Sequence, residues 1–122
     1  MPTIKIQHMN FHYESVGQGE AVVFLHGFTG SHEDWRFQME VIKDRFRAVA
    51  LDFRGHGRTE APAKESDYSI YLNVGDVKGL LDGLGIQRCC LVGHSMGGFT
   101  ALQFALENPG RLWGLVLVDT SS

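Results

Sequence analysis

The stretch that most constrains the fold of this chain is residues 91–98, which read LVGHSMGG. An apolar run ends at Val92, Gly93 and Gly97 flank Ser95, and a helical pattern follows. An aliphatic run with a glycine stop favours a buried strand, so the stretch predicts a strand, a sharp turn and a helix. A side chain at either glycine would collide with the backbone as it doubles back. Ser95 is therefore expected at a helix N-terminus, where free N–H groups and the helix dipole stabilise negative charge.

Length and composition predict one globular domain spanning residues 1–122. The chain is 43% hydrophobic and 20% charged, which is ordinary for a folded protein of this length. The net charge of −3 comes without any basic block, so we expect neither a nucleic-acid nor a membrane partner. We also expect no secretory leader and no membrane span, because no apolar run is suited to either.

The cysteines and histidines suggest neither a disulfide nor a metal. The only cysteines are Cys89 and Cys90, on a predicted strand where neighbouring side chains point to opposite faces. A bond between them is not expected, and they favour a reducing, cytoplasmic location. The six histidines show no recognised metal-ligand spacing. We therefore expect no metal and no other cofactor.

Strands and helices are predicted to alternate after two initial strands. The six predicted strands cover residues 3–7, 11–15, 21–25, 46–52, 89–92 and 113–118. The three predicted helices open at Ser31, run through residues 70–84, and follow the turn at Ser95. This order implies an α/β fold with a mostly parallel sheet and helices on both faces. On the second strand, Phe11 and Tyr13 share a face, and His8 and His12 are expected to be exposed.

Each predicted helix carries an apolar stripe expected to be buried. The stripes are Trp35, Met39, Ile42 and Phe46; Ile70, Val74, Val77, Leu81 and Leu84; and Phe99, Leu102, Ala105 and Leu106. The second helix also has a stripe of Gly75, Gly79 and Gly83. Interior glycines cost about 1 kcal/mol each relative to alanine. The stripe reflects either chance in a glycine-rich chain or the close approach of another backbone, and the sequence leaves both open.

Loops at the ends of the predicted strands resemble those of the α/β-hydrolase superfamily. The matching strings are HGFTG at residues 26–30, DFRGHG at 52–57 and GHSMGG at 93–98, and LVLVDT at 115–120 resembles the following strand. The chain is most similar to small esterases, lactonases, cofactor-free haloperoxidase-like enzymes and the succinyl-hydroxycyclohexadiene-carboxylate synthases of menaquinone synthesis. The resemblance covers only the N-terminal half of that fold. It implies a half-size α/β-hydrolase with strand order 1-2-4-3-5-6.

The resemblance also implies roles for individual residues. Ser95 is the nucleophile, on the turn known as the nucleophile elbow. The backbone N–H groups of Phe28 and Met96 form the oxyanion hole, which stabilises the negative charge that builds on a carbonyl oxygen under attack. His26 and His94 are interpreted as structural neighbours of these loops.

The sequence does not identify an acid and a base for Ser95. In this superfamily both follow the nucleophile, but no histidine follows Ser95. Asp119, at the end of the last strand, is either the acid or the cap of a turn. His32, opening a helix beside the oxyanion loop, is either the base or an exposed first-turn residue. His56 is a similar candidate, in a loop at the same edge of the sheet.

Two functions follow from these residues. The first is a serine hydrolase that acts on small carboxylic esters or lactones through a Ser95 acyl-enzyme and assembles its site as a homodimer. The second is a catalytically weak or inactive hydrolase fragment, or a binding scaffold, that needs a second half. Ester turnover compared with a Ser95→Ala control distinguishes them.

The homodimer is predicted from an edge strand. Residues 115–118 are all apolar, which is typical of a strand covered on both faces. The nearest basic residue, Arg111, precedes the strand, so no charge protects this edge from pairing with another chain. A two-fold dimer would bury it.

Overall fold

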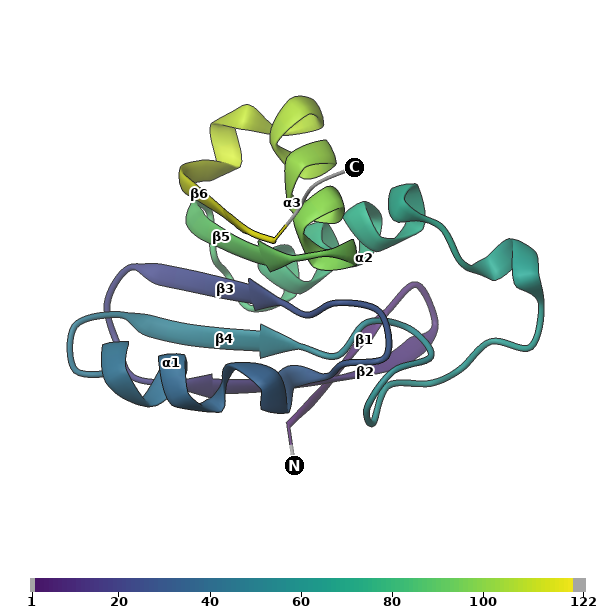
Figure 1. Ribbon diagram of the computed structural model, residues 1–122, viewed down its shortest axis with the longest axis horizontal. Coiled ribbons are helices and arrows are strands. Elements are labelled where there is room, and N and C mark those ends of the chain that lie inside the picture. Colours follow the sequence, from purple (N-terminus) through teal and green to yellow (C-terminus); the bar gives the residue numbers. More distant parts are fainter. Residues whose placement is uncertain (1, 120–122) are drawn as a thin grey trace.

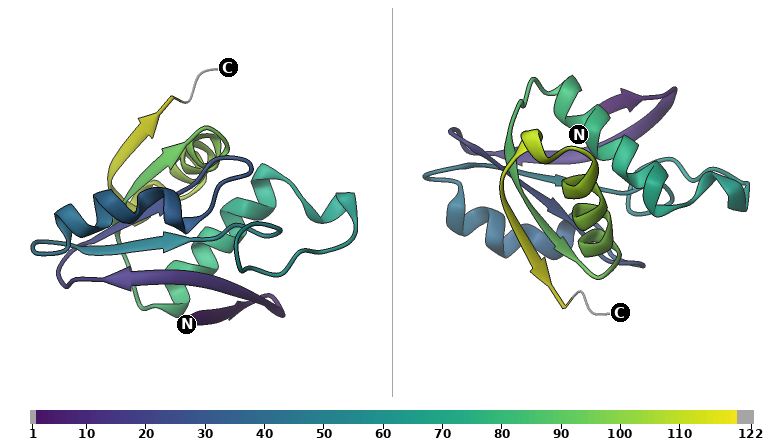
Figure 2. Two further views of the ribbon diagram at one scale, coloured as in Figure 1. Left: turned by 60° about the horizontal axis from the view of Figure 1, so that its bottom comes forward. Right: turned by 90° about the horizontal axis from the view of Figure 1, so that it is seen from above.

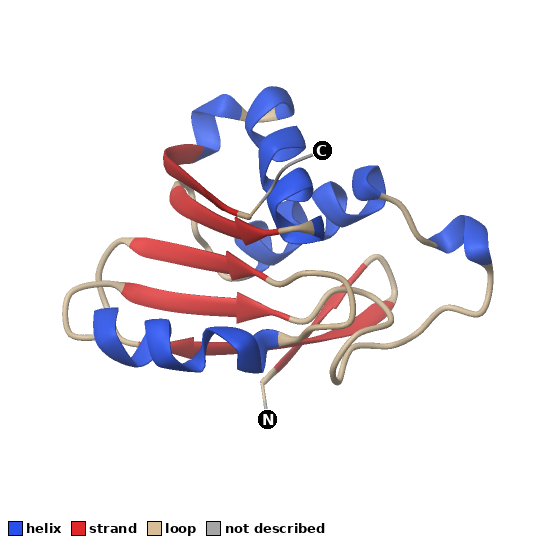
Figure 3. Cartoon of the chain, viewed as in Figure 1, coloured by secondary structure: helices blue, strands red, loops and turns tan. Residues whose placement is uncertain are grey.

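A computed structural model describes residues 2–119 of the chain. The strands are β1 (Thr3–Ile6), β2 (Met9–Val16), β3 (Ala21–Leu25), β4 (Arg47–Leu51), β5 (Cys89–His94) and β6 (Leu112–Val118). The helices are α1 (Arg36–Ile42), α2 (Ile70–Gly83) and α3 (Met96–Glu107), with short 3-10 turns η1 (His32–Trp35), η2 (Glu65–Asp67) and η3 (Pro109–Arg111). Figure 3 shows how the strands and helices alternate. Within these residues, no helix is long and apolar enough to cross a lipid bilayer.

The six strands form one sheet in the order β1-β2-β4-β3-β5-β6, which confirms the predicted order (Figure 1). The pairs β1–β2 and β2–β4 are antiparallel, and the other three pairs are parallel. At the centre of the sheet, Val23 of β3 lies opposite Val49 of β4 and Leu91 of β5. The parallel strands bring the loops after β3, β4 and β5 to one edge of the sheet, as in other open α/β folds.

Helices cover both faces of the sheet, as the alternation of elements predicted (Figure 2). One face packs against α2 and α3, and its core includes Val23, Leu25 and Phe104. The other face packs against η1 and α1, and its core includes Phe24 and Trp35. Consecutive residues of β3 point to opposite faces, so an entirely apolar strand contributes to both cores.

The glycine stripe of α2 makes room for β1. A Cβ at Gly79 would collide with the side chain of Ile6, and one at Gly83 would collide with Ile4. The close approach that the stripe suggested is therefore present, although isoleucine side chains approach the helix instead of another backbone. Gly75 has only Gln7 nearby, at 4.0 Å, so the stripe matters at two of its three positions.

The buried face of α3 differs from the prediction. Phe99, Leu102 and Leu106 are exposed, by 40%, 41% and 70%, whereas Ala101 and Phe104 are fully buried. At the start of the helix, Gly97 lies against the carbonyl oxygen of Leu25 at the end of β3, and Ala101 and Phe104 pack into the core against the sheet. The helix is apolar on two faces, so the hydrophobic pattern could not select the buried one.

His12 on β2 is also buried, with 1% of its surface exposed, where exposure was expected. Its ring packs under that of His32, with ring centroids 4.7 Å apart. His8, at the turn before β2, is exposed as expected. Alternation along β2 correctly grouped the residues of each face. The face that carries His12 is covered by the start of η1, however, and local sequence does not reveal this.

Candidate active site

Ser95 sits on a strained turn between β5 and α3. Its backbone angles are φ 54° and ψ −115°, a conformation that few residues other than glycine adopt. A Cβ at Gly93 would collide with the backbone of Gly97, and a Cβ at Gly97 would collide with the carbonyl oxygen of Leu25. The two glycines therefore let the strand, the turn and the helix pack against one another. The unusual conformation predicted for Ser95 is confirmed.

The loop after β3, residues 26–30, lies directly against this turn. A Cβ at Gly27 would be 3.0 Å from His94 Nδ1 and 3.3 Å from Ser95 Cβ, so only glycine fits this contact easily. Phe28 is 72% exposed, and it lines the same cleft as Met96. The structure thus brings the two predicted oxyanion residues together beside the serine. The roles of their N–H groups stay predictions.

His26 is a structural residue, as expected. Its side chain is fully buried, its Nδ1 lies 2.7 Å from the Gly27 carbonyl oxygen, and its Nε2 accepts from the Phe53 N–H at 3.0 Å. These partners assign the proton to Nδ1, giving a neutral ring. Burial lowers the pKa of His26, and this outweighs the opposing effect of the Gly27 carbonyl. The neutral ring ties the loop after β3 to the loop after β4.

His32, the predicted candidate base, is held by Asp52. Its backbone N–H donates to Asp52 Oδ1 at 2.6 Å, and its Nδ1 lies 2.8 Å from the same oxygen. Asp52 is fully buried, which by itself would raise its pKa, but hydrogen bonds from the Arg58 N–H and from His32 lower it below the usual range. His32 lines a different cleft from Phe28 and Met96. The geometry gives its assignment as the base no direct support.

His56 is the histidine that lies beside the oxyanion residues. Its ring centroid is 5.6 Å from that of Phe28, edge to face, and it lines the cleft that Phe28 and Met96 share. Its Nδ1 lies 3.0 Å from the Arg54 carbonyl oxygen. Within the described residues, His56 is therefore a better placed candidate for proton transfer than His32.

Asp119 follows β6 and lies next to the serine turn. The register pairs His94 with Val118, and the Ser95 N–H donates to the Val118 carbonyl oxygen at 3.4 Å. Asp119 has φ 47° and lines a small cleft of about 270 Å³ with His26 and His94. The structure therefore places Asp119 near the serine turn, and its role as the acid stays a prediction.

The cleft beside Phe28 and Met96 has a volume of about 550 Å³. Its walls are largely apolar and include Phe53, Tyr68 and Ile70. A cleft of this size and character suits a small, mostly apolar molecule.

One wall of this cleft is held by a buried ion pair that the sequence did not reveal. Arg54 Nε and Nη2 bind the two carboxylate oxygens of Asp76 on α2, at 2.8 and 2.9 Å. Arg54 Nη1 also donates to the Asp67 carbonyl oxygen at 2.7 Å. Burial raises the pKa of Asp76 despite its arginine partner. The pair fastens the long loop between β4 and α2 to the rest of the fold.

The sheet order, the strained serine and the loops at the sheet edge define an α/β hydrolase, and the chain belongs to this family. The family model described as alpha/beta hydrolase fold matches residues 20–122.

Individual relatives agree with this assignment. "Epoxide hydrolase 2" of Siraitia grosvenorii is 44% identical over 115 residues, which are 93% of this chain and 36% of that protein. A crystal structure of an epoxide hydrolase from Vigna radiata superposes with a TM-score of 0.95 at 34% identity, covering 99% of this chain and 40% of its own. A structure described as an N-acyl homoserine lactone degrading enzyme superposes with a TM-score of 0.93 at 34% identity. The match covers 99% of this chain and 46% of that one. The chain thus spans about a third of the length of the curated relatives it matches.

Proposed function

We propose that this chain carries the nucleophile and the oxyanion hole of a serine hydrolase that acts on small carboxylic esters or lactones. The observation that supports this most directly is the backbone of Ser95, strained at φ 54° in contact with the loop of Phe28. Strain of this kind persists where surrounding structure enforces it, and it is concentrated at active sites. In the proposed reaction, Ser95 Oγ bonds to the carbonyl carbon, the alcohol leaves with the proton, and water then releases the acid.

The chemistry of serine favours esters over the epoxides named for several relatives. If Ser95 Oγ attacked an epoxide carbon, the product would be an ether, which water does not cleave under mild conditions. Attack on an ester or lactone gives an acyl ester, which water hydrolyses. A serine nucleophile therefore turns over esters and lactones but would be blocked after one reaction with an epoxide. The similarity to a lactone-degrading enzyme is consistent with this choice.

The cysteines do not compete with Ser95 as nucleophiles. Both thiols are buried and neither is in a disulfide, and burial raises the pKa of Cys89 to about 12. A thiol reacts as the thiolate, so these residues are inert at neutral pH. Two free thiols also support the proposed cytoplasmic location.

We propose that two copies of the chain form a homodimer. The sheet edge at β6 exposes Leu115, Val116 and Leu117 by 37–46%, and α3, which packs against β6, exposes Phe99 and Leu106. An apolar surface on an open sheet edge favours association. A stable dimer would bury roughly 2,000 Å² or more. A partner copy is also one route by which a further histidine could reach Ser95.

Light scattering at micromolar concentration tests the dimer. We expect the unmodified chain to have twice the mass of a monomer, and we expect Val116→Asp to give aggregated or unfolded protein. A well-folded monomer of the unmodified chain would contradict the proposed assembly.

Hydrolysis assays test the proposed activity. The unmodified chain should hydrolyse a short-chain nitrophenyl ester and a simple lactone, and Ser95→Ala should not. Ser15→Ala, on β2, is the matched control and should retain the activity. An aromatic epoxide should give at most one covalent adduct per chain. Steady turnover of the epoxide, or equal ester turnover by Ser95→Ala, would contradict the proposal.

A weak or inactive hydrolase fragment is the second candidate. The observation that favours it is the position of His32, the predicted base, which lines a different cleft from the oxyanion residues Phe28 and Met96. Without a base, about 10³–10⁴ of rate enhancement over water survives in a serine hydrolase. Covalent labelling of Ser95 without measurable turnover would identify this case.

A further inference from the structure

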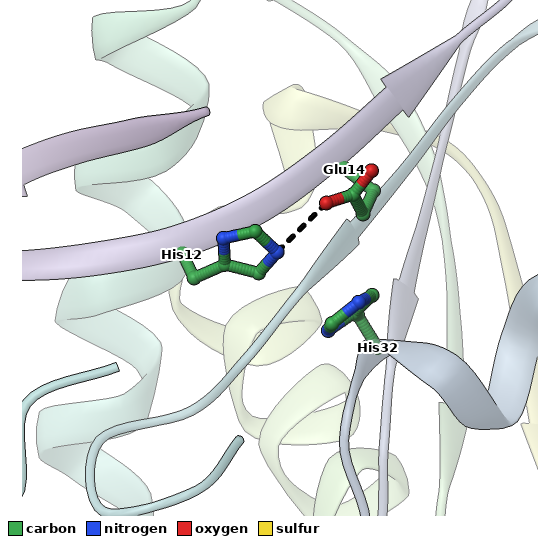
Figure 4. A group of neighbouring side chains, drawn as sticks. All are labelled: His12, Glu14 and His32. Atoms are coloured by element: carbon green, nitrogen blue, oxygen red, sulfur yellow. Dashed lines mark ion pairs between the residues drawn. The ribbon is translucent and has the colours of Figure 1, made fainter. Parts of the chain in front are cut away.

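We propose that His12, Glu14 and His32 form a binding site for a divalent transition-metal ion, with Zn²⁺ as the best match. Each of the three residues offers a ligand atom, and these atoms lie within 4.8 Å of one another. His12 and Glu14 are on the same face of β2, and His32 reaches them from the start of η1 (Figure 4). Two imidazoles and one carboxylate leave a fourth position for water, a ligand set that suits Zn²⁺.

The unusual state of His12 points to a missing ligand. The residue is 1% exposed, and among the described residues neither ring nitrogen has a hydrogen-bond partner. His12 Nε2 lies 2.7 Å from Glu14 Oε2, yet without the orientation of a hydrogen bond. Buried polar nitrogens in proteins are nearly always satisfied. A cation bound between the imidazole and the carboxylate gives a partner to one ring nitrogen and to the carboxylate.

Asp52 prepares His32 to act as a ligand. Its carboxylate contacts His32 Nδ1 at 2.8 and 3.0 Å, which leaves Nε2 for the ion. The carboxylate itself is fixed by the backbone N–H of Arg58, at 3.0 Å. A buried carboxylate behind a histidine ligand is the usual outer shell of a zinc site, and it fixes the tautomer and the ring orientation. Sequence spacing missed this arrangement because the ligands come from two elements 18 residues apart.

Charge and geometry both fit a divalent ion. The carboxylates of Glu14 and Asp52 together neutralise two positive charges. Bonds of about 2.0–2.1 Å in a tetrahedron set ligand atoms about 3.3 Å apart, so side-chain shifts of about 1 Å complete the site. Access is open, because Glu14 and His32 line a cleft of about 150 Å³, and the Glu14 side chain is 33% exposed.

The site lies in a different cleft from the proposed oxyanion residues. His32 follows Phe28 by four residues, at the start of η1. A bound ion would therefore tie the end of the loop after β3 to β2. The inference does not depend on ester hydrolysis, and it is tested by binding alone.

The test is calorimetric titration of the chelator-treated chain with Zn²⁺, together with the visible absorption of the Co²⁺ form. We expect one ion per chain and a Co²⁺ spectrum of four-coordinate intensity. Glu14→Gln should weaken Zn²⁺ binding about tenfold or more. Glu33→Gln removes a carboxylate from the same cleft and is the matched control, which should bind as the unmodified chain does.

Proton NMR of the Co²⁺ form gives a readout that needs no variant. The ring protons of His12 and His32 should shift far outside their normal range, whereas those of exposed His8 should not. Absence of saturable binding at micromolar Zn²⁺, or equal binding by Glu14→Gln and the unmodified chain, would overturn the site. Binding lost equally in Glu33→Gln would also overturn it. In those cases His12 and Glu14 form an ion pair only.

Discussion

Replacement of Asp76 by asparagine tests the buried ion pair that holds the loop between β4 and α2. Arg54 and Asp76 have side chains that are 7% and 1% exposed, and two hydrogen bonds join them. Asp76→Asn keeps the shape but removes the charge, which leaves the guanidinium buried without its counter-ion. Breaking a buried pair in this way costs about 3–5 kcal/mol.

The predicted shift in melting temperature is large for a chain of this length. At about 2.1 cal/mol/K per residue, the unfolding entropy of this chain is roughly 0.26 kcal/mol/K. A loss of about 4 kcal/mol therefore lowers the melting temperature by roughly 15 °C. The shift is measured by thermal unfolding, followed by circular dichroism at pH 7 and at constant protein concentration.

A second ion pair on the same helix provides the control. Asp82 binds Arg111 at 2.9 Å, but the two side chains are 58% and 24% exposed. Such a pair contributes at most about 1 kcal/mol, so Asp82→Asn should lower the melting temperature by less than about 4 °C. The reasoning is wrong if the Asp76 and Asp82 variants melt at the same temperature. An Arg54→Met/Asp76→Leu double variant should recover most of the loss.

Three further predictions concern the core, the elbow and pH. Phe104→Ala should lower the free energy of unfolding in urea by about 3–5 kcal/mol, whereas Leu106→Ala should change it by less than about 0.5 kcal/mol. Equal losses would contradict the burial of the Phe104 face of α3. Gly93→Ala should lower the melting temperature and abolish covalent labelling of Ser95, because its Cβ meets the backbone of α3; normal labelling would contradict this. Because the folded-state pKa of His26 is below 6.5, unfolding takes up a proton as pH falls, so stability should fall from about pH 6.5 downward. Urea unfolding at pH 7 and pH 5 checks this, and His26→Asn should weaken the dependence.

Local sequence was enough to predict the buried strand and the strained turn at Ser95, whereas the order of the sheet was implied by the resemblance to the α/β-hydrolase superfamily. The run before Val92 and the glycines around Ser95 allow only a buried strand followed by a tight turn, and the structure has both. Trp35 and Met39 of the predicted stripe are buried as expected, although Phe37 and Val41 on α1 are apolar and exposed. These features depend on residues close together in the chain.

Features that depend on distant residues could not be predicted. The second face of α3 is as apolar as its buried face, so only the packing of its first turn on β3 decides between them. The burial of His12 requires His32, and the pairing of Arg54 with Asp76 joins a loop to a helix 22 residues away. Side chains from separate elements meet only through the tertiary fold, and no local periodicity encodes such contacts.

The most direct test of the central claim is mass spectrometry of the chain after reaction with a fluorophosphonate. The proposal predicts one covalent adduct per chain, located by peptide mapping on Ser95, because the strained turn and the oxyanion hole activate this serine alone. The Ser95→Ala variant should remain unmodified under the same conditions. No adduct on the folded chain, or an equal adduct on Ser95→Ala, would contradict the assignment of Ser95 as the nucleophile.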